Sequence, residues 1–392
     1  MKRLMLTAMV CGLCWANLGQ AAEQEEAAIE REPQIQMAIL LDTSSSMSGL
    51  IEQAKTQLWT IVNEFATSRQ GGRVPMLEVA LYEYGKSSLA QEEDYLRMIV
   101  GLTTDLDKVS QELFALTTNG GAEYCGAVIR AAVGGLKWSE SGEDFKVIFI
   151  AGTEPFTQGK VDYREACKAA VERGIIVNTI HCGGEQQGIE GKWRDGALLA
   201  DGQYMQIDQN REAVYVAAPQ DAEIARLGEA LNGTYIAFGA LGDASAMNQA
   251  AQDTNAANSS PKSAVQRAVT KASVQYRNSG WDLVDAVREE QVELKEIDEE
   301  SLPEEMRELD MAGREAYVAQ KQQEREEIQK QIQALNGQRR AHVAAEMKKL
   351  ADQGADTLEA VIIRAIREQA TQKNFTFVPE TPVEEPGEEA TP

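Results

Sequence analysis

The sequence predicts an α/β fold built on a doubly wound, mostly parallel sheet, followed by a mainly α-helical region of coiled-coil-like composition. Two observations carry this prediction. Apolar strands alternate with amphipathic helical segments over residues 35–239, which is the pattern of a parallel sheet covered by helices on both faces. Residues 263–378 then show helical spacing, few glycines and many charges, which is typical of long, partly exposed helices.

The strands and helices of the first region follow one another in a regular order. Strands are expected at 37–41, 77–82, 95–102, 145–151, 175–180, 203–208 and 234–238. Helices are expected at 50–67, 105–116, 123–135, 162–173, 193–201 and 221–231. Gly174 marks the end of one of these helices, because glycine readily adopts the left-handed cap conformation. These elements predict one domain over residues 35–239.

The other segments are predicted from composition. Residues 1–21 have a basic start, an apolar stretch and small residues near their end, as in a Sec-type signal peptide, so we expect a periplasmic or extracellular protein. Residues 22–34 are an acidic lead-in, and residues 240–262 have the polar composition of a linker. Residues 263–378 are expected to form a hairpin, a small bundle or a coiled coil, interrupted near Asn336 and Gly337. Residues 379–392 contain five acidic and no basic residues and are predicted to be disordered.

The chain is strongly acidic, with 62 Asp and Glu against 38 Lys and Arg and a formal net charge of −24. Such a charge repels nucleic acid and anionic membranes, which argues against both as main partners. The apolar stretch at the start is too short and too interrupted for a stable membrane span. We therefore expect a protein partner, with homo-oligomerisation through the helical region as a further option.

Polar side chains follow directly after the first strand of the predicted sheet. Asp42, Ser44 and Ser46 occupy every second position there, at the carboxyl end of a central strand where doubly wound sheets bind ligands. Carboxylate and hydroxyl oxygens suit a cation such as Mg²⁺ or Mn²⁺. A serine-rich loop that only caps the next helix, with Ser48 as the cap, explains the same residues.

Residues 40–47, Leu-Leu-Asp-Thr-Ser-Ser-Ser-Met, resemble the Asp-x-Ser-x-Ser metal-ion-dependent adhesion motif of von Willebrand factor type A (VWA) domains. The resemblance implies a VWA fold over residues 35–239 and a secreted bacterial binding protein rather than an enzyme. It also implies that Ser44 and Ser46 coordinate a divalent ion directly and that Asp42 acts through water. In that family the ion's open position takes a carboxylate from the partner.

Two other positions depart from the family pattern, so the adhesion site is degenerate. The second loop has Ala122 where the family has Thr, and Glu123 is then the nearest oxygen donor. The third loop has Gly152 where the family has Asp, and Thr153 or Glu154 could substitute. The predicted metal ligands are Asp42, Ser44, Ser46, Glu123 and Glu154. The predicted ligand-facing residues are Thr43, Tyr124 and Thr153.

Three cysteines follow the signal segment, at positions 125, 167 and 182. Export permits a disulfide, and both Cys167 with Cys182 and Cys125 with Cys182 are conceivable pairs, the first being geometrically plausible. A nucleophile formed by Cys125 or Cys182 with His181 is the enzymatic alternative, although it lacks an identifiable orienting group. The main hypothesis is a VWA binding protein, and its competitor is a self-associating envelope protein with a vestigial metal site.

Overall fold

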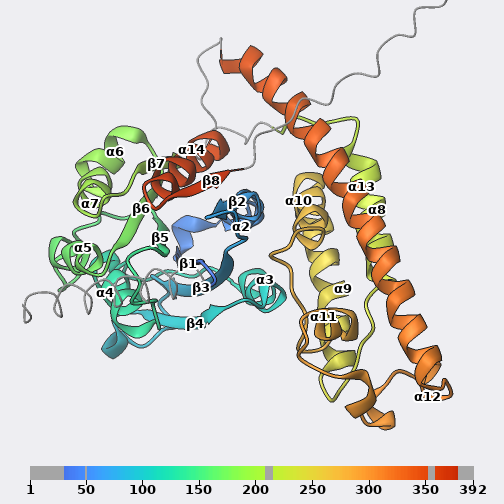
Figure 1. Ribbon diagram of the computed structural model, residues 1–392. Helices are drawn as coiled ribbons and strands as arrows, with labels where there is room; N and C mark the ends of the chain where they lie inside the picture. The colour runs from blue at the N-terminus through green and yellow to red at the C-terminus, as the bar shows by residue number, and fades with distance from the viewer. Residues whose placement is uncertain (1–30, 49–50, 208–214, 352–357, 378–392) are drawn as a thin grey trace, which may run out of the picture.

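The computed structural model describes residues 31–48, 51–207, 215–351 and 358–377 (Figure 1). The predicted signal peptide, most of the acidic lead-in and the C-terminal tail lie outside the described residues. No helix in the described ranges is long and apolar enough to cross a lipid bilayer.

A six-stranded sheet forms the centre of the N-terminal domain (Figure 1). Its strands are β1 (Gln34–Asp42), β3 (Met76–Tyr84), β4 (Leu96–Thr103), β5 (Phe145–Gly152), β6 (Ile175–Cys182) and β7 (Tyr204–Ile207). They lie in the order β4-β3-β1-β5-β6-β7, and only the edge strand β4 runs antiparallel. Counted along the chain this is the 3-2-1-4-5-6 order of doubly wound folds. The predicted fold class is confirmed.

Helices cover both faces of this sheet. One face carries α4 (Cys125–Gly135), α5 (Tyr163–Glu172), α6 (Glu185–Glu190) and α7 (Trp193–Leu199); the other carries α2 (Ile51–Ala66), α3 (Leu106–Ala115) and α14 (Leu358–Thr371). Along β1, Met37 and Leu41 join the core on one side, and Ala38 and Leu40 join the core on the other. Successive strand residues point to opposite faces, so β1 is buried on both sides.

The last helix of the chain completes the core of the first domain. Ile362 and Ile366 of α14 are fully buried against the sheet. The side-chain amides of Gln369 and Asn178 exchange hydrogen bonds of 2.8 and 3.0 Å. After α14, the short strand β8 (Phe375–Phe377) pairs with β2 (Ser68–Gln70), which follows α2. The sequence analysis assigned residues 263–378 to a separate helical region and did not predict that α14 packs against the sheet.

The remaining helices form a second, helical unit. Its members are α8 (Asp221–Asn232), α9 (Gly242–Ser259), α10 (Pro261–Lys271), α11 (Leu283–Arg288), α12 (Glu304–Arg307) and α13 (Met311–Ala351). Single 3₁₀ turns occur at Ser45–Met47, Gln91–Glu93, Leu294–Glu296 and Glu299–Ser301. An apolar cluster that includes Ile224, Val265 and Ile332 joins α8, α10 and α13. The 41-residue α13 continues across Asn336 and Gly337, where an interruption was expected.

Two segments differ from the sequence predictions. The expected linker at 240–262 forms α9 and the start of α10. Polar contacts hold α9 in place: Gln252 Oε1 accepts a hydrogen bond from Ser110 of α3 (3.0 Å), and Gln249 Nε2 donates to the Tyr276 hydroxyl (3.0 Å). Because polar contacts hold α9, its sequence carries no apolar stripe, and the hydropathy pattern of residues 242–259 does not predict a helix.

The predicted strand at 234–238 is also wrong. Ala237 makes only an isolated bridge with Asp282, outside the sheet. The buried Arg325 of α13 pairs with Asp282 (2.6 Å) and donates to the Thr234 carbonyl (2.7 Å). A guanidinium can satisfy a carboxylate and a carbonyl at once, and these bonds attach the segment to the helical unit.

A buried ion-pair network joins the two units. Arg267 of α10, 2% exposed, pairs with Asp107 of α3 (2.6 Å) and with Asp253 of α9 (2.9 Å). Lys271 also binds Asp253 (2.6 Å), and the Tyr276 hydroxyl donates to Asp107 (2.5 Å). Removing one member of such a network leaves a buried charge without its partner, which costs about 3–5 kcal/mol. The two units are therefore expected to stay docked.

Shortening one buried side chain of α14 tests whether this C-terminal helix belongs to the core of the N-terminal domain. Ile366→Ala should lower the free energy of unfolding by about 2–5 kcal/mol, because it opens a cavity in a fully buried site. Thr371→Ala, at an exposed position of the same helix, is the control and should have little effect. Urea denaturation followed by circular dichroism measures both. Equal stability of the two variants would contradict the packing of α14 on the sheet.

Candidate functional site

The loop after β1 folds around a buried carboxylate. Asp42 Oδ1 accepts a hydrogen bond from the Ser44 backbone N–H (2.7 Å), and Oδ2 accepts one from the Ser44 hydroxyl (3.0 Å). The hydroxyl oxygens of Ser44 and Ser46 are 2.6 Å apart. An aspartate that binds the backbone two residues ahead makes a stable local turn. Asp42 therefore orients both serines of the motif toward one point.

Glu123 lies where these hydroxyls converge. In the sequence it follows Ala122, which occupies the position of the family's threonine. Its buried carboxylate accepts hydrogen bonds from the backbone N–H groups of Thr153 (3.2 Å) and Glu154 (3.0 Å). The Thr153 hydroxyl lies 3.3 Å from that carboxylate and 2.6 Å from the Ser46 hydroxyl, which itself lies 3.4 Å from Glu123. The loops that follow β1 and β5 and the loop before α4 thus meet at Glu123.

The structure brings together most of the residues singled out in the sequence. Asp42, Ser44, Ser46 and Glu123 form one cluster with Thr153, which had been expected only to face a ligand. Glu154 differs, since its side chain is exposed and its backbone makes the contacts: its N–H donates to Glu123 and its carbonyl accepts from Trp193 Nε1 (2.8 Å).

The other two ligand-facing predictions have different outcomes. Thr43 is fully buried, and its hydroxyl donates to Glu83 or to the Tyr84 carbonyl, both at 3.2 Å. It therefore points away from the edge, because it continues the alternation of β1 on the opposite face from Asp42. Tyr124 is half-buried beside the cluster and packs edge-on against Tyr95, with ring centroids 5.9 Å apart.

The cluster carries two buried acids that repel each other. Burial and the nearby Glu123 carboxylate raise the pKa of Asp42 to about 9. Burial lowers the pKa of His181, whose Nε2 lies 3.2 Å from the Thr153 carbonyl, so its ring stays neutral at pH 7. A cation would relieve the repulsion between Asp42 and Glu123.

The donor set fits a hard divalent cation. Three hydroxyls and two carboxylates converge, and oxygen atoms are the ligands that Mg²⁺ and Mn²⁺ prefer. The described residues contain no group of three or more His, Cys, Asp or Glu side chains arranged to hold a metal. A cation here would therefore depend on the Ser44, Ser46 and Thr153 hydroxyls as well as on the acids.

Two glycines that the sequence left unexplained make room for the cluster. A Cβ on Gly152 would lie 2.4 Å from the Tyr84 hydroxyl and 3.0 Å from the Trp193 ring. That hydroxyl donates to the Ala151 carbonyl at 2.9 Å, so Tyr84 fills the space that a family-type Asp side chain would enter. Gly85 has φ +80°, and a Cβ there would lie 2.5 Å from Asp42 Oδ1. Only glycine fits at either position.

The cysteines do not support the expected disulfide. Cys125 and Cys167 pack in the core on the α4 and α5 face of the sheet, whereas Cys182 packs in the core on the opposite face. Neither Cys167 nor Cys125 can reach Cys182 through the sheet, and no disulfide is formed among the three. Burial also raises the pKa of all three thiols, that of Cys167 to about 12. A cysteine nucleophile needs the opposite shift.

The raised pKa of Asp42 predicts a pH dependence of stability. The folded chain holds a proton on Asp42 at pH values where the unfolded chain, with a pKa of 3.8, has lost it. Stability in chelator should therefore fall as the pH rises from about 4 to about 9. Asp42→Asn should flatten this slope, as measured by thermal unfolding across that range. Parallel slopes for the two proteins would show that Asp42 does not carry the effect.

The close contact at Gly152 predicts strong coupling with Tyr84. Gly152→Ala should cost about 1–3 kcal/mol of stability, because the added methyl group overpacks the site. In the Tyr84→Phe background the same substitution should cost clearly less, since the clashing hydroxyl is gone. A double-mutant cycle in urea gives the coupling energy. Additive costs would rule out this explanation of the missing aspartate.

No family model and no curated protein sequence matches the chain. Among solved structures, the chain is similar to the VWA domain of SpRpn10, with 16% identity over 46% of this chain and 90% of that one and a TM-score of 0.35. It is similar to BatB from Bacteroides thetaiotaomicron, with 18% identity over 44% of this chain and 90% of BatB and a TM-score of 0.34. It is also similar to proximal thread matrix protein 1 from the mussel byssus, in a structure with a zinc-occupied MIDAS motif. The identity is 14% over 46% of this chain and 43% of that one, with a TM-score of 0.34.

Likenesses this distant carry no functional conclusion. The fold follows instead from the strand order, the single antiparallel edge strand and the loop after the central strand. By these features the N-terminal domain of this chain has the VWA fold, with an Asp-x-Ser-x-Ser loop at the carboxyl end of β1.

Proposed function

We propose that this chain is an exported binding protein whose VWA domain holds a partner protein through a divalent cation, Mg²⁺ or Mn²⁺, at the edge around Asp42. One observation carries the proposal: the hydroxyls of Ser44, Ser46 and Thr153 converge with the carboxylate of Glu123 beside Asp42. This convergence lies at the carboxyl end of the central strand, where doubly wound folds bind ligands.

Each residue of the cluster has a distinct role in this proposal. Ser44, Ser46 and Thr153 supply neutral oxygens, and Glu123 supplies the charged one that the family places elsewhere. Asp42 positions Ser44 through two hydrogen bonds. The cation supplies a positive charge to which a carboxylate of the partner can bind.

The overall charge of the chain makes such binding strictly dependent on the cation. A protein with a net charge of −24 repels an acidic partner at long range. A cation at the Asp42 edge provides a local attraction that the acidic surface itself lacks. Export is part of the proposal because the chain begins with a basic, then apolar segment.

A matched pair of serines tests the metal site. Ser46→Ala should weaken Mg²⁺ or Mn²⁺ binding roughly 10- to 100-fold, because it removes an oxygen from the cluster. Ser45→Ala, at an exposed position of the same loop, should bind as the unmodified chain does. Isothermal titration calorimetry measures both. Identical heats from the two variants, or no heat from the unmodified chain, would refute the metal site.

The partner is tested with the same two variants. A protein captured by the immobilised chain in Mg²⁺ should be released by chelator, retained by Ser45→Ala and not captured by Ser46→Ala. A partner that stays bound in chelator and binds both variants equally would leave the protein-binding role standing but remove the cation from it.

Self-association through the helical unit is the second candidate. It is favoured by two large apolar side chains on the surface of that unit, Leu241 and Met247, which are 67% and 74% exposed. This candidate requires oligomers that persist in chelator, and light scattering of a monomer at high concentration would exclude it.

A further inference from the structure

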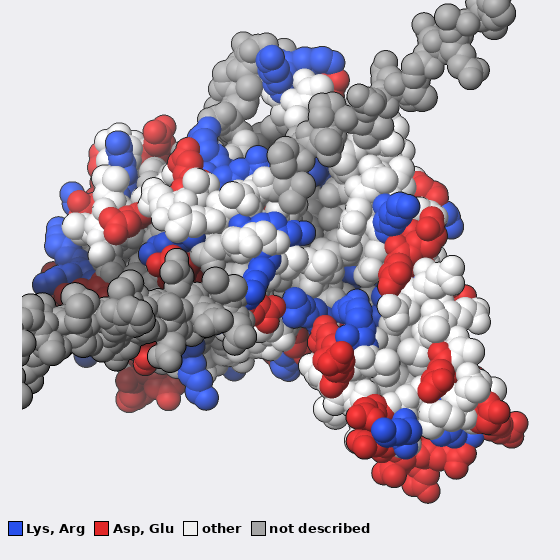
Figure 2. All heavy atoms as spheres, viewed as in Figure 1, with Lys and Arg blue, Asp and Glu red and all other residues white. Residues whose placement is uncertain are grey.

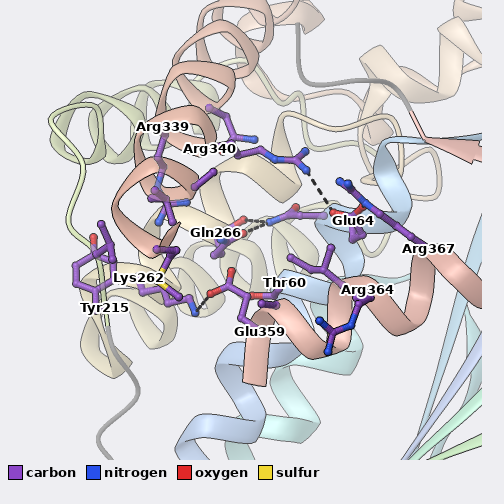
Figure 3. A pocket seen from close by; sticks show the side chains of 18 of the residues that line it. Thr60, Glu64, Tyr215, Lys262, Gln266, Arg339, Arg340, Glu359, Arg364 and Arg367 are labelled. Atoms are coloured by element: carbon purple, nitrogen blue, oxygen red, sulfur yellow. Dashed lines mark hydrogen bonds and ion pairs between the residues drawn. The ribbon is translucent and has the colours of Figure 1, made fainter. Parts of the chain in front are cut away.

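A cavity of about 490 Å³ lies where the N-terminal domain meets the helical unit (Figure 3). Its walls come from α2 and α14 of the first and from α10 and α13 of the second, with residues 215 and 216 closing one side. Small-molecule sites in proteins usually occupy roughly 300–1,000 Å³. The cavity shares no residue with the Asp42 cluster, so its function is a separate question.

The cavity combines an apolar wall with a cationic one. The apolar side chains are Val216, Val343, Ala344, Met347, Ala360 and Ile363. The charged side chains are Lys262, Arg339, Arg340, Arg364 and Arg367, against Glu64, Glu359 and Glu368. Five cations thus face three carboxylates in a chain whose net charge is −24. Among the residues that the structure describes, the lining of the cavity is thus richer in cations than in carboxylates.

Ion pairs within the lining hold the cationic side chains in place. Arg367 binds Glu64 at 2.6 Å, and Arg340 approaches the same carboxylate from α13 at 3.5 Å (Figure 3). Lys262 binds Glu359 at 2.6 Å. Arg339 binds Asp221, which lies outside the lining, at 2.7 Å.

The surface around the cavity also differs from the far end of the helical unit. Exposed acidic side chains crowd residues 290–310 near α12, at the opposite end of α13 (Figure 2). Charge unevenly distributed over a surface steers ions, so anions are repelled at that end of α13, whereas the cationic wall lies toward the other end.

A buried hydroxyl in the cavity wall has no partner. Thr60 of α2 is 3% exposed, and its Oγ1 makes no hydrogen bond with the residues that the structure describes. Buried polar groups in proteins are almost always hydrogen-bonded, to protein, water or a ligand. Thr60 is among the residues that line the cavity, as Gln266 and Glu359 are (Figure 3), so rotation of its side chain would let the hydroxyl bind a polar group held there.

We propose that this cavity binds a small amphipathic anion, a molecule with one carboxylate head and a single aliphatic chain. The chain would pack on Met347, Val343 and Ile363, and the head would lie among the arginines within reach of the Thr60 hydroxyl. A carboxylate suits guanidinium groups, which bind it with charge-assisted hydrogen bonds. Because α2 and α14 face α10 and α13 across the cavity, the bound molecule would contact both units. The inference does not depend on the proposed metal site.

Titration calorimetry with decanoate tests this site in the full chain. Decanoate should bind saturably with one molecule per chain. Decanol, which lacks the charge, and butyrate, which lacks the chain length, should each bind at least tenfold more weakly. No saturable binding of decanoate, or equal binding of decanol, would overturn the proposal.

A matched pair of methionines places the ligand in the cavity. Met347→Asp puts a negative charge on the apolar wall and should weaken decanoate binding at least tenfold. Met98→Asp, at a 51% exposed position of β4 outside the cavity, should leave binding unchanged. Thr60→Val keeps the shape of the side chain and removes the hydroxyl, and it should weaken decanoate more than decanol. Equal affinity of the two methionine variants, with both shown to be folded by circular dichroism, would refute the site.

Discussion

Two carboxylates, those of Asp42 and Glu123, are buried next to each other at the end of the central strand, and the binding edge is built around this repulsive contact. Burying two like charges is unfavourable unless a proton or a cation neutralises one of them. The surrounding residues keep the pair in place: Ser44 binds Asp42, and the loop after β5 donates two backbone N–H groups to Glu123. Gly85 and Gly152 leave the space that the arrangement requires. The edge therefore has two adjacent acidic side chains, surrounded by hydroxyls, at which a cation can replace a proton.

The helical half of the chain is part of the same folded body. α14 supplies Ile362 and Ile366 to the core under the sheet, and the Arg267–Asp107 pair ties α10 to α3. An ion pair with both partners buried tolerates the loss of neither, so the two units have one preferred arrangement. α2, the helix that follows the Asp42 loop, carries Thr60 and Glu64 into the cavity between the units. One helix thus follows the first candidate site in the sequence and lines the second.

Local patterns in the sequence were enough to predict the doubly wound sheet, since apolar strands and amphipathic helices are defined by neighbouring residues. The spacing of Asp42, Ser44 and Ser46 indicated their cluster, and the alternation of strand residues could also have placed Thr43 on the other face. Other features depend on contacts between distant residues. The polar helix α9 is held by hydrogen bonds to distant partners such as Ser110. The apolar spacing of α14 indicates a helix, but it does not indicate that this helix packs on the sheet of the first domain. The role of Gly152 becomes visible only when the Tyr84 hydroxyl is in place.

We propose that the cluster around Glu123 holds a divalent cation despite its departures from the family motif. Anomalous X-ray diffraction from crystals of the chain grown in Mn²⁺ tests it most directly. We expect an anomalous peak in contact with the Ser44 and Ser46 hydroxyls and the Glu123 carboxylate. A fully ordered Asp42 loop without a peak there, in crystals that show Mn²⁺ elsewhere, would contradict it.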